Sequence, residues 1–340
     1  EIYTQAMQYL DDAIADLQKE DLIDPEAQDL LYQGDAEKWL KLAYGLKARY
    51  TMHLLKRSAN KDADMEKVLE YVNNSFESAE EQAAFDVYDA NNINPLYGFF
   101  VARAGLGASE SMRSKLAEYN DPRLSRAFIT KQGASGKEQA PGTADNAVYA
   151  PNGTPEQGTS KYGTSLFMYS ISAPTLLLSY HELKFLEAEA LCRLERDAKS
   201  ALKDAVVAGL LNAENSFTIS RKELGKTLIN AASSITEAEA ESYFDNTIEA
   251  KYTAEPLKTT MTQKYFALWG ASGEATESYN DVRRMKGLGE NFIELKNPNS
   301  FPLRCPYGNS DTTTNAEVKA AYGNGQYVYS ENVWWAGGSR

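Results

Sequence analysis

Residues 180–190 read YHELKFLEAEA, and a histidine followed by a glutamate in a helix-like stretch fits either a zinc site or a packed helix. A zinc H-E-x-x-H site needs a second histidine four residues after the first, so that both imidazoles face the metal. That position holds Phe185, and the only other histidine of the sequence, His53, lies far away along the chain. We therefore predict no metal site and no cofactor, and we interpret the stretch as a packed helix.

The pattern around this stretch predicts a central helix over residues 173–194, with Pro174 in its first turn. Apolar residues lie on most sides of it, and a helix of that kind is buried on most sides. They are Leu183, Phe185, Leu186, Ala188, Ala190, Leu191 and Leu194. Glu189 would then be partly buried and would need a partner. We expect Arg283 or Arg284 to lie within salt-bridge distance of Glu189 or Glu187.

Composition restricts the classes of function. The chain has 340 residues, 43% of them hydrophobic and 24% charged, with a net charge of −13. Such a length provides a large core in one to three domains. The negative charge argues against binding to nucleic acid or to anionic lipid, because both require clustered Lys and Arg. Acidity by itself fits a neutral or cationic ligand, or simply solubility.

Helical periodicity continues through most of the sequence, whereas strand-like alternation is scarce, so we predict an all-α fold. Thr4, Asp35 and Thr236 are candidate N-caps. The spacing of Trp39, Leu42, Ala43 and Leu46 is that of a tetratricopeptide helix, although no regular 34-residue period follows. The predicted helices cover residues 4–18, 36–57, 64–76, 111–119, 197–211, 236–251, 259–269 and 274–285.

Long irregular stretches interrupt these helices at residues 91–100, 131–163 and 287–340. A structureless insertion of the length of 131–163 is usually functional or disordered. The aromatic rings in these stretches could provide flat surfaces for a sugar, with amides and carboxylates beside them for its hydroxyls. Alternatively, the rings hold the loops on the body of the protein. The predicted ligand-binding residues are Tyr97, Phe99, Tyr149, Asn152 and Tyr162.

Sequence motifs give little support for an enzyme. Ser58 and Lys61 have the S-x-x-K spacing of serine β-lactamases, but the S-D-N and K-T-G partners are absent. The chain has no G-x-S-x-G, Walker or G-x-G-x-x-G motif, which disfavours hydrolase, NTPase and dinucleotide-binding functions. The many acidic residues could include a glycosidase pair, but no spacing singles out two of them.

Two further features bear on the cellular compartment. Cys192 and Cys305 form no disulfide framework, and the sequence does not decide whether they pair. Cys192 lies in an apolar helical run, where we expect a buried small hydrophobe. The first residues, EIYTQAMQYL, do not resemble a signal peptide, so the chain is cytoplasmic, processed or truncated. The uncharged stretch at 162–180 contains Gly163 and Pro174, which favours a buried loop over a membrane span.

Several blocks resemble one family, the SusD/RagB-like proteins. The segment ALWGASGEATESYNDVRRMKG (267–287), preceded by TQK (262–264), is similar to a block of that family. So are SYHELKFLEAEAL (179–191), FPLRCPYGNSDTTTN (301–315) and the closing VWW (333–335). The chain has Tyr307-Gly308 where the family has Tyr-Pro, and Asp311 where it has glutamate.

The resemblance implies a surface-exposed lipoprotein of the outer membrane of Bacteroidetes-type bacteria. Such proteins bind a glycan or another nutrient without catalysis and cover a SusC-like TonB-dependent transporter. The implied fold is helical, with tetratricopeptide-like pairs and long loop insertions. The family's lipidated N-terminal segment and its first helices are expected before residue 1. The family motifs are structural, so no ligand residue is carried over from them.

On this basis we predict one SusD-like domain with three parts. Residues 1–76 would form tetratricopeptide-like helices, 77–172 a loop-rich part that faces the ligand, and 173–340 the helical core and C-terminal loops. Two other functions remain open. The chain could be a scaffold that contacts the transporter without a small-molecule site of its own, or, less favoured, a glycoside hydrolase.

Overall fold

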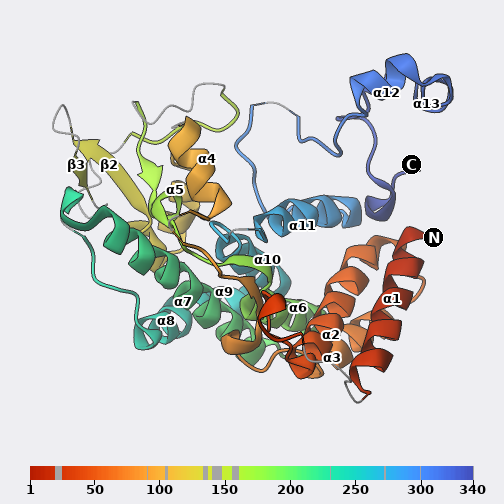
Figure 1. The fold of residues 1–340 in the computed structure, drawn as a ribbon, viewed down its shortest axis with the longest axis horizontal. Helices are drawn as coiled ribbons and strands as arrows, with labels where there is room; N and C mark the ends of the chain where they lie inside the picture. The colour runs from red at the N-terminus through yellow and green to blue at the C-terminus, as the bar shows by residue number, and fades with distance from the viewer. Residues whose placement is uncertain are drawn as a thin grey trace.

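The computed structural model is predominantly helical, as predicted, and α6 (Tyr180–Arg193) packs against α3, α7 and α10 near its centre (Figure 1). Leu183, Phe185 and Ala188 of α6 are buried, which confirms that the opening stretch is a packed helix. The structure describes residues 1–19, 25–89, 91–103, 106–132, 137–139, 148–154, 161–229, 231–271, 273–298 and 300–339.

The N-terminal helices α1 (Ile2–Leu17), α2 (Ala36–His53) and α3 (Lys61–Asn73) pack side by side (Figure 1). The Asp35 side chain accepts a hydrogen bond from the backbone N–H of Lys38, so the predicted cap of α2 is confirmed. The prediction for Thr4 was wrong, because α1 already begins at Ile2 and Thr4 lies inside it.

Helix α6 begins later than predicted. Residues Thr175–Leu178 form strand β5, which pairs antiparallel with β1 (Ala83–Phe85). Ser179 then caps α6, and its Oγ accepts from the N–H of Glu182 at 3.0 Å. Pro174 therefore precedes a strand and does not lie in the first helical turn.

Helix α7 (Lys199–Leu224) is longer than the predicted 197–211. It continues past Asn212 because Ala213, Phe217 and Ser220 are buried in the core on its inner face. Gly209 lets α7 approach α10 (Pro256–Ala267) closely, since a Cβ at this position would lie 2.9 Å from the Cβ of Ala267.

A small sheet has the strand order β4-β2-β3-β6. In it, β2 is antiparallel to both of its neighbours, β4 and β3, whereas β3 and β6 are parallel. Its strands are β2 (Phe128–Gln132), β3 (Lys137–Gln139), β4 (Thr164–Ser165) and β6 (Leu228–Ile229). The irregular stretch predicted at 131–163 thus contains strand residues. Within it, residues 133–136, 140–147 and 155–160 lie outside the described residues.

The prediction of a loop over residues 91–100 was wrong for its second half, which forms α4 (Pro95–Arg103). The Asn94 side chain accepts from the N–H of Leu96 at 2.8 Å, and Pro95 is acceptable in a first helical turn. Tyr97 and Phe99 therefore lie on a helix.

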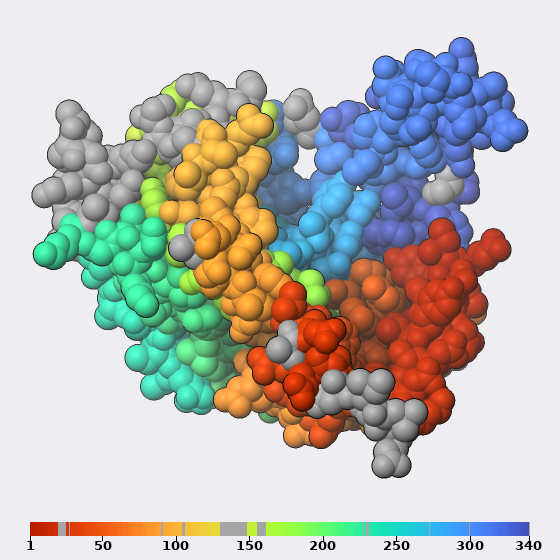
Figure 2. All heavy atoms as spheres, in the orientation of Figure 1, coloured from red at the N-terminus to blue at the C-terminus, as the bar shows by residue number. Residues whose placement is uncertain are grey.

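The other helices complete the architecture. Thr236 caps α8, as predicted, and a π-helical turn (Phe244–Ile248) separates α8 from α9. Helices α12 and α13 form a lobe that projects at the upper right of Figure 2. The remaining helices have the following bounds: α5 (Glu110–Glu118), α8 (Glu237–Tyr243), α9 (Glu249–Ala254), α11 (Ala275–Leu288), α12 (Asn309–Thr314) and α13 (Ala316–Tyr322). Single 3₁₀ turns lie at Glu26–Gln28, Leu54–Arg57, Ala79–Glu81, Pro122–Ser125, Leu166–Tyr169, Gly225–Thr227 and Trp334–Ala336.

Buried ion pairs join α6 to its neighbours. Glu182 and Glu189 are two helical turns apart, so both project from the same side of α6. Arg49 of α2 forms a salt bridge with Glu182, and Arg284 of α11 donates to Glu189 Oε1 at 2.5 Å and Oε2 at 2.8 Å. The expected pairing of Glu189 with an arginine is confirmed, and Arg284 is that arginine.

Two smaller expectations concern cysteines and membrane spans. Cys192 and Cys305 are both free thiols, Cys305 exposed and Cys192 half-buried beside Thr260. In the part of the chain that the structure describes, we find no helix with the length and hydropathy needed to cross a bilayer.

Candidate functional site

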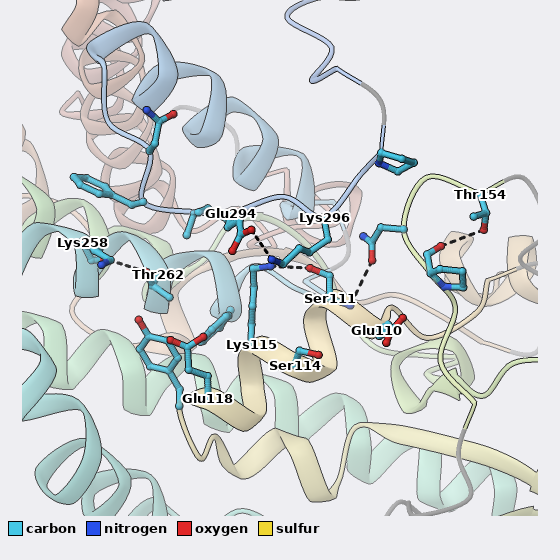
Figure 3. Close-up of a pocket in the computed structure, with 18 residues that line it drawn as sticks. Glu110, Ser111, Ser114, Lys115, Glu118, Thr154, Lys258, Thr262, Glu294 and Lys296 are labelled. Atoms are coloured by element: carbon cyan, nitrogen blue, oxygen red, sulfur yellow. Dashed lines mark hydrogen bonds and ion pairs between the residues drawn. The ribbon is translucent and has the colours of Figure 1, made fainter.

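A groove of about 840 Å³ lies between α5, one face of α10, and two irregular segments at 151–154 and 291–298 (Figure 3). Its lining mixes hydroxyl, amide, ammonium and carboxylate groups with aromatic rings. A site that holds a small organic ligand needs this combination of polar groups and apolar surface. We therefore treat the groove as the candidate site.

Helix α5 forms one wall of the groove. Its inner face packs in the core, and its outer face carries polar side chains. Met112 and Leu116 are buried and pack in a cluster with Phe128 and Phe266, which fixes the inner face. The polar residues Ser111, Ser114, Lys115 and Glu118 are spaced three or four apart, so they share the outer face and line the groove (Figure 3).

The segment 151–154 is fastened to the start of α5 by one side chain. Ser109 caps α5 by accepting from the N–H of Met112 at 3.2 Å, and its hydroxyl donates to Asn152 Oδ1 at 3.0 Å. Asn152 Oδ1 also accepts from the N–H of Ser111 at 3.4 Å. The amide nitrogen of Asn152 makes no hydrogen bond within the described residues, so it remains a donor for a ligand in the groove.

The opposite wall comes from α10 and from residues 291–298. Thr262 donates to the backbone oxygen of Lys258 at 2.8 Å, and the Lys258 ammonium lies 2.8 Å from Glu255 Oε2. One end of the groove closes where Gly153, at φ 75°, meets Pro298. A Cβ on Gly153 would lie 2.5 Å from the Pro298 Cδ, so only glycine fits at this contact.

Charged groups meet at the middle of the groove. The Lys115 ammonium donates to Ser111 Oγ at 2.7 Å, and Lys296 forms an ion pair with Glu294 on the facing segment (Figure 3). Burial lowers the pKa of Lys115, Glu294 and Glu118 act in the opposite direction, and Lys296 lowers the pKa further. The hydrogen bond and charge of Lys296 hold the pKa of Glu294 below its ordinary value.

Of the five residues predicted to bind ligand, Asn152 lines this groove, and the other four are not among its lining residues in the described part of the chain. Tyr149 lies beside it, with its ring edge-on to Phe128 at 5.2 Å and the Arg113 guanidinium 5.5 Å from its centroid. Tyr162 is 7% exposed, with Lys161 over its ring.

The two remaining predicted residues lie on α4. The Tyr97 hydroxyl donates to Glu223 Oε1 of α7 at 3.3 Å, while the Phe99 side chain is 52% exposed. The structure thus places the five residues in different surroundings. An exposed ring such as that of Phe99 is available to a ligand, whereas the ring of Tyr162 is largely covered.

Lys115, Glu118 and Phe292 line the groove but were not predicted from the sequence. The helical periodicity of residues 111–119 did predict the helix α5. A polar helical face is ordinarily solvated, so the periodicity could not indicate that α10 and residues 291–298 lie opposite it.

Comparisons with known proteins agree with this architecture. Residues 1–307 match a family of SusD-like proteins described as starch-binding and associating with the outer membrane. A SusD/RagB family protein from Bacteroides thetaiotaomicron is 67% identical over all of this chain and 73% of its own, with a TM-score of 0.94. No curated protein matches the chain.

More distant solved structures share the fold. A SusD homolog from Bacteroides fragilis is 19% identical over 98% of this chain and 74% of its own, with a TM-score of 0.72. A chitin-binding protein is 20% identical over 98% of this chain and 72% of its own, with a TM-score of 0.67. At these identities the likeness concerns the fold alone.

Proposed function

The chain belongs to the SusD-like family, whose members are described as starch-binding and associated with the outer membrane, and from this we propose that it binds a glycan in the groove beside α5. The bound glycan is released unaltered to a SusC-like TonB-dependent transporter, which this protein covers at the cell surface as a lipid-anchored partner.

The observation that carries the proposal is the chemistry of the groove lining. A sugar presents hydroxyl groups around its ring edge and C–H groups on its faces, so it needs hydrogen-bonding side chains together with apolar surface. Ser111, Asn152 and Glu118 offer the first, and Phe292 and Pro298 offer the second. Tyr149 supports this wall, and Phe99 offers a further exposed ring on α4.

One carboxylate of the groove, Glu294, has a pKa shift opposite to the one that a glycosidase acid needs. A glycosidase acid needs a carboxyl group with a raised pKa close to the sugar. In the groove, the pKa of Glu294 is lowered by Lys296. The pKa of Glu274 is raised by burial and by Glu182, but this residue is fully buried in the core and does not line the groove.

Calorimetric titration with a panel of soluble oligosaccharides tests the binding proposal. We expect stoichiometric binding that is weakened about tenfold by Asn152→Ala, because the variant removes the amide donor and releases segment 151–154 from Ser109. Phe99→Ala and Tyr162→Ala test the two predicted aromatic contacts outside the groove lining. Absence of binding across the panel would favour the scaffold without a small-molecule site.

Two further measurements separate the remaining parts of the proposal. Reducing-sugar release by the purified protein should stay at the buffer background, and enzyme-like turnover would favour a glycoside hydrolase instead. Affinity purification of the tagged protein from outer membranes in mild detergent should recover a TonB-dependent transporter. Recovery of the protein alone would count against the transporter partnership.

A further inference from the structure

Of the lysines that line the groove, Lys115 is the one without an ion pair in the part of the chain that the structure describes. Lys115 is half-buried on α5, and within the described residues its ammonium makes no ion pair; its one hydrogen bond goes to the neutral hydroxyl of Ser111, at 2.7 Å. The other lysines that line the groove differ in this respect. Lys258 pairs with Glu255, and Lys296 pairs with Glu294.

A half-buried ammonium without an ion pair, such as that of Lys115, costs folding free energy. Taking an ammonium partly out of water disfavours its charged form unless an anion compensates, and the lowered pKa of Lys115 reflects that cost. The hydrocarbon stem alone could be packed by an uncharged residue. The charge of Lys115 therefore has no stabilising ion pair among the described residues and is available to a ligand in the groove.

The acidic residues near Lys115 leave its ammonium without an ion pair in the part of the chain that the structure describes. The Lys115 side chain points from α5 toward the facing segment that carries Glu294 and Lys296 (Figure 3). Because Lys296 already neutralises Glu294, the three groups together carry one net positive charge. Glu110 and Glu118 also line the groove on α5, and Glu118, one helical turn from Lys115, raises the Lys115 pKa without forming an ion pair with it among the described residues.

We propose that the groove selects acidic glycans, and that Lys115 binds a carboxylate or sulfate group of the sugar between α5 and the segment 291–298. This inference rests on the proposed function and specifies its class of ligand. Ser111 keeps the ammonium in place, and the ligand's anionic group supplies the charge partner that the described residues do not provide. The net charge of −13 does not prevent this, because charges beyond about 8 Å are largely screened at physiological ionic strength.

The test uses an array that carries neutral amylo- and xylo-oligosaccharides, oligogalacturonides, and chondroitin with and without sulfate. We expect binding confined to members with acidic groups. Preference for oligogalacturonides and unsulfated chondroitin assigns Lys115 to a carboxylate, and binding that requires sulfate assigns it to a sulfate ester. Equal binding of neutral members would overturn the inference and leave the proposed function intact. Binding to no member would contradict both.

Variants of Lys115 separate a role in recognition from a role in folding. Lys115→Met should weaken binding of the acidic oligosaccharide at least about tenfold, and Lys115→Arg should retain most of it, since a charge-assisted hydrogen bond is lost only in the first. The midpoint of thermal unfolding should not fall in either variant. Lys67→Met, which removes a lysine of α3 that is paired with Asp64 and does not line the groove, should change the affinity less than about threefold. Equal affinity losses for Lys115→Met and Lys67→Met would contradict the assignment.

Discussion

Lys264 in the core and Lys115 in the groove are both lysines shielded from water, and they have opposite electrostatic surroundings. Lys264 is fully buried, with its ammonium 2.8 Å from Asp281 Oδ2. Burial alone would lower its pKa, but Asp281 and the nearby Glu182 and Glu189 outweigh this, so the pKa is raised. Lys115 has no carboxylate at ion-pair distance among the described residues, and burial lowers its pKa.

The two regions therefore use charge for different purposes. Around α6, Arg49, Arg284 and Lys264 are each paired with carboxylates that come from other helices, so the charges fix how α2, α6, α10 and α11 pack. In the groove, the charge of Lys115 contributes nothing to such packing. Replacing a charge should consequently affect stability in the first region and binding in the second.

The largest effect is expected for Arg284→Met. The variant leaves Glu189 buried with one fewer cation, so the free energy of unfolding should fall by about 3–5 kcal/mol in chemical denaturation. Its matched control is Arg283→Met, the adjacent residue, whose guanidinium lies over the rings of Tyr279 and Trp335. That control should lose only about 1 kcal/mol. Similar losses in both would show that the buried pair has no special weight.

The next largest effect is the loss of folding stability at acidic pH. Burial lowers the pKa of His181 from 6.5 to about 4, with Arg123 and Lys264 adding to the shift and Glu182 opposing it. The unfolded chain therefore takes up a proton at higher pH than the folded chain. This part of the stability is complete above about pH 6.5 and is lost as the pH falls toward 4, on the order of 3 kcal/mol in all.

The variant His181→Gln isolates this contribution. Its unfolding free energy, measured at several pH values, should decline less steeply than that of the wild type between pH 6.5 and 4. Below that range both proteins should lose stability, because Arg49 holds the pKa of the buried Glu182 down to about 2 against the opposing effect of burial. An unchanged slope between pH 6.5 and 4 in the variant would contradict the assignment to His181.

Helix caps give a smaller contrast between the two regions. Ser179→Ala leaves the N–H of Glu182 without its partner in a fully buried place, which should cost about 1–3 kcal/mol. Ser109→Ala removes the cap of the partly exposed α5, which should cost about 1 kcal/mol. Only the second should weaken glycan binding, since it also frees Asn152. The two losses are compared by thermal unfolding, and the opposite order would be evidence against the contrast.

The smallest change in stability is expected for Lys115→Met, within about 0.5 kcal/mol of the wild type or slightly above it. The reference variant Lys264→Met should instead lose about 3–5 kcal/mol, because Asp281 keeps a buried charge with one cation removed. Chemical denaturation of the two variants side by side measures the difference. A large loss in Lys115→Met would assign the groove lysine a structural role.

The sequence predicted the helical core well because apolar periodicity reports burial directly. The surrounded helix at 180–190 and the pairing of Glu189 with an arginine of the DVRR segment are both confirmed. Boundaries were less accurate where local and tertiary signals compete. Pro174 predicted the start of a helix, but residues 175–178 pair with β1 instead. Asn212 predicted the end of a helix, but it lies inside α7, which continues to Leu224.

The candidate site was harder to predict, because a groove depends on which surfaces face each other. Asn152 was predicted and lines the groove, while the aromatic rings of α4 were assigned to a loop that is in fact a helix. The acidic composition fitted a neutral or cationic ligand, or simply solubility, and the proposed acidic ligand differs from the first two. Net charge averages over the whole surface, whereas Lys115 acts within a few ångströms of a ligand.

Hydrogen–deuterium exchange with and without a bound oligosaccharide tests most directly whether the groove beside α5 is the binding site. We predict slower exchange in α5, in residues 151–154 and in residues 291–298, with little change in α2 and α6, which are already held by their ion pairs. Protection confined to α4 or to the projecting lobe of α12 and α13, with α5 unchanged, would contradict this account.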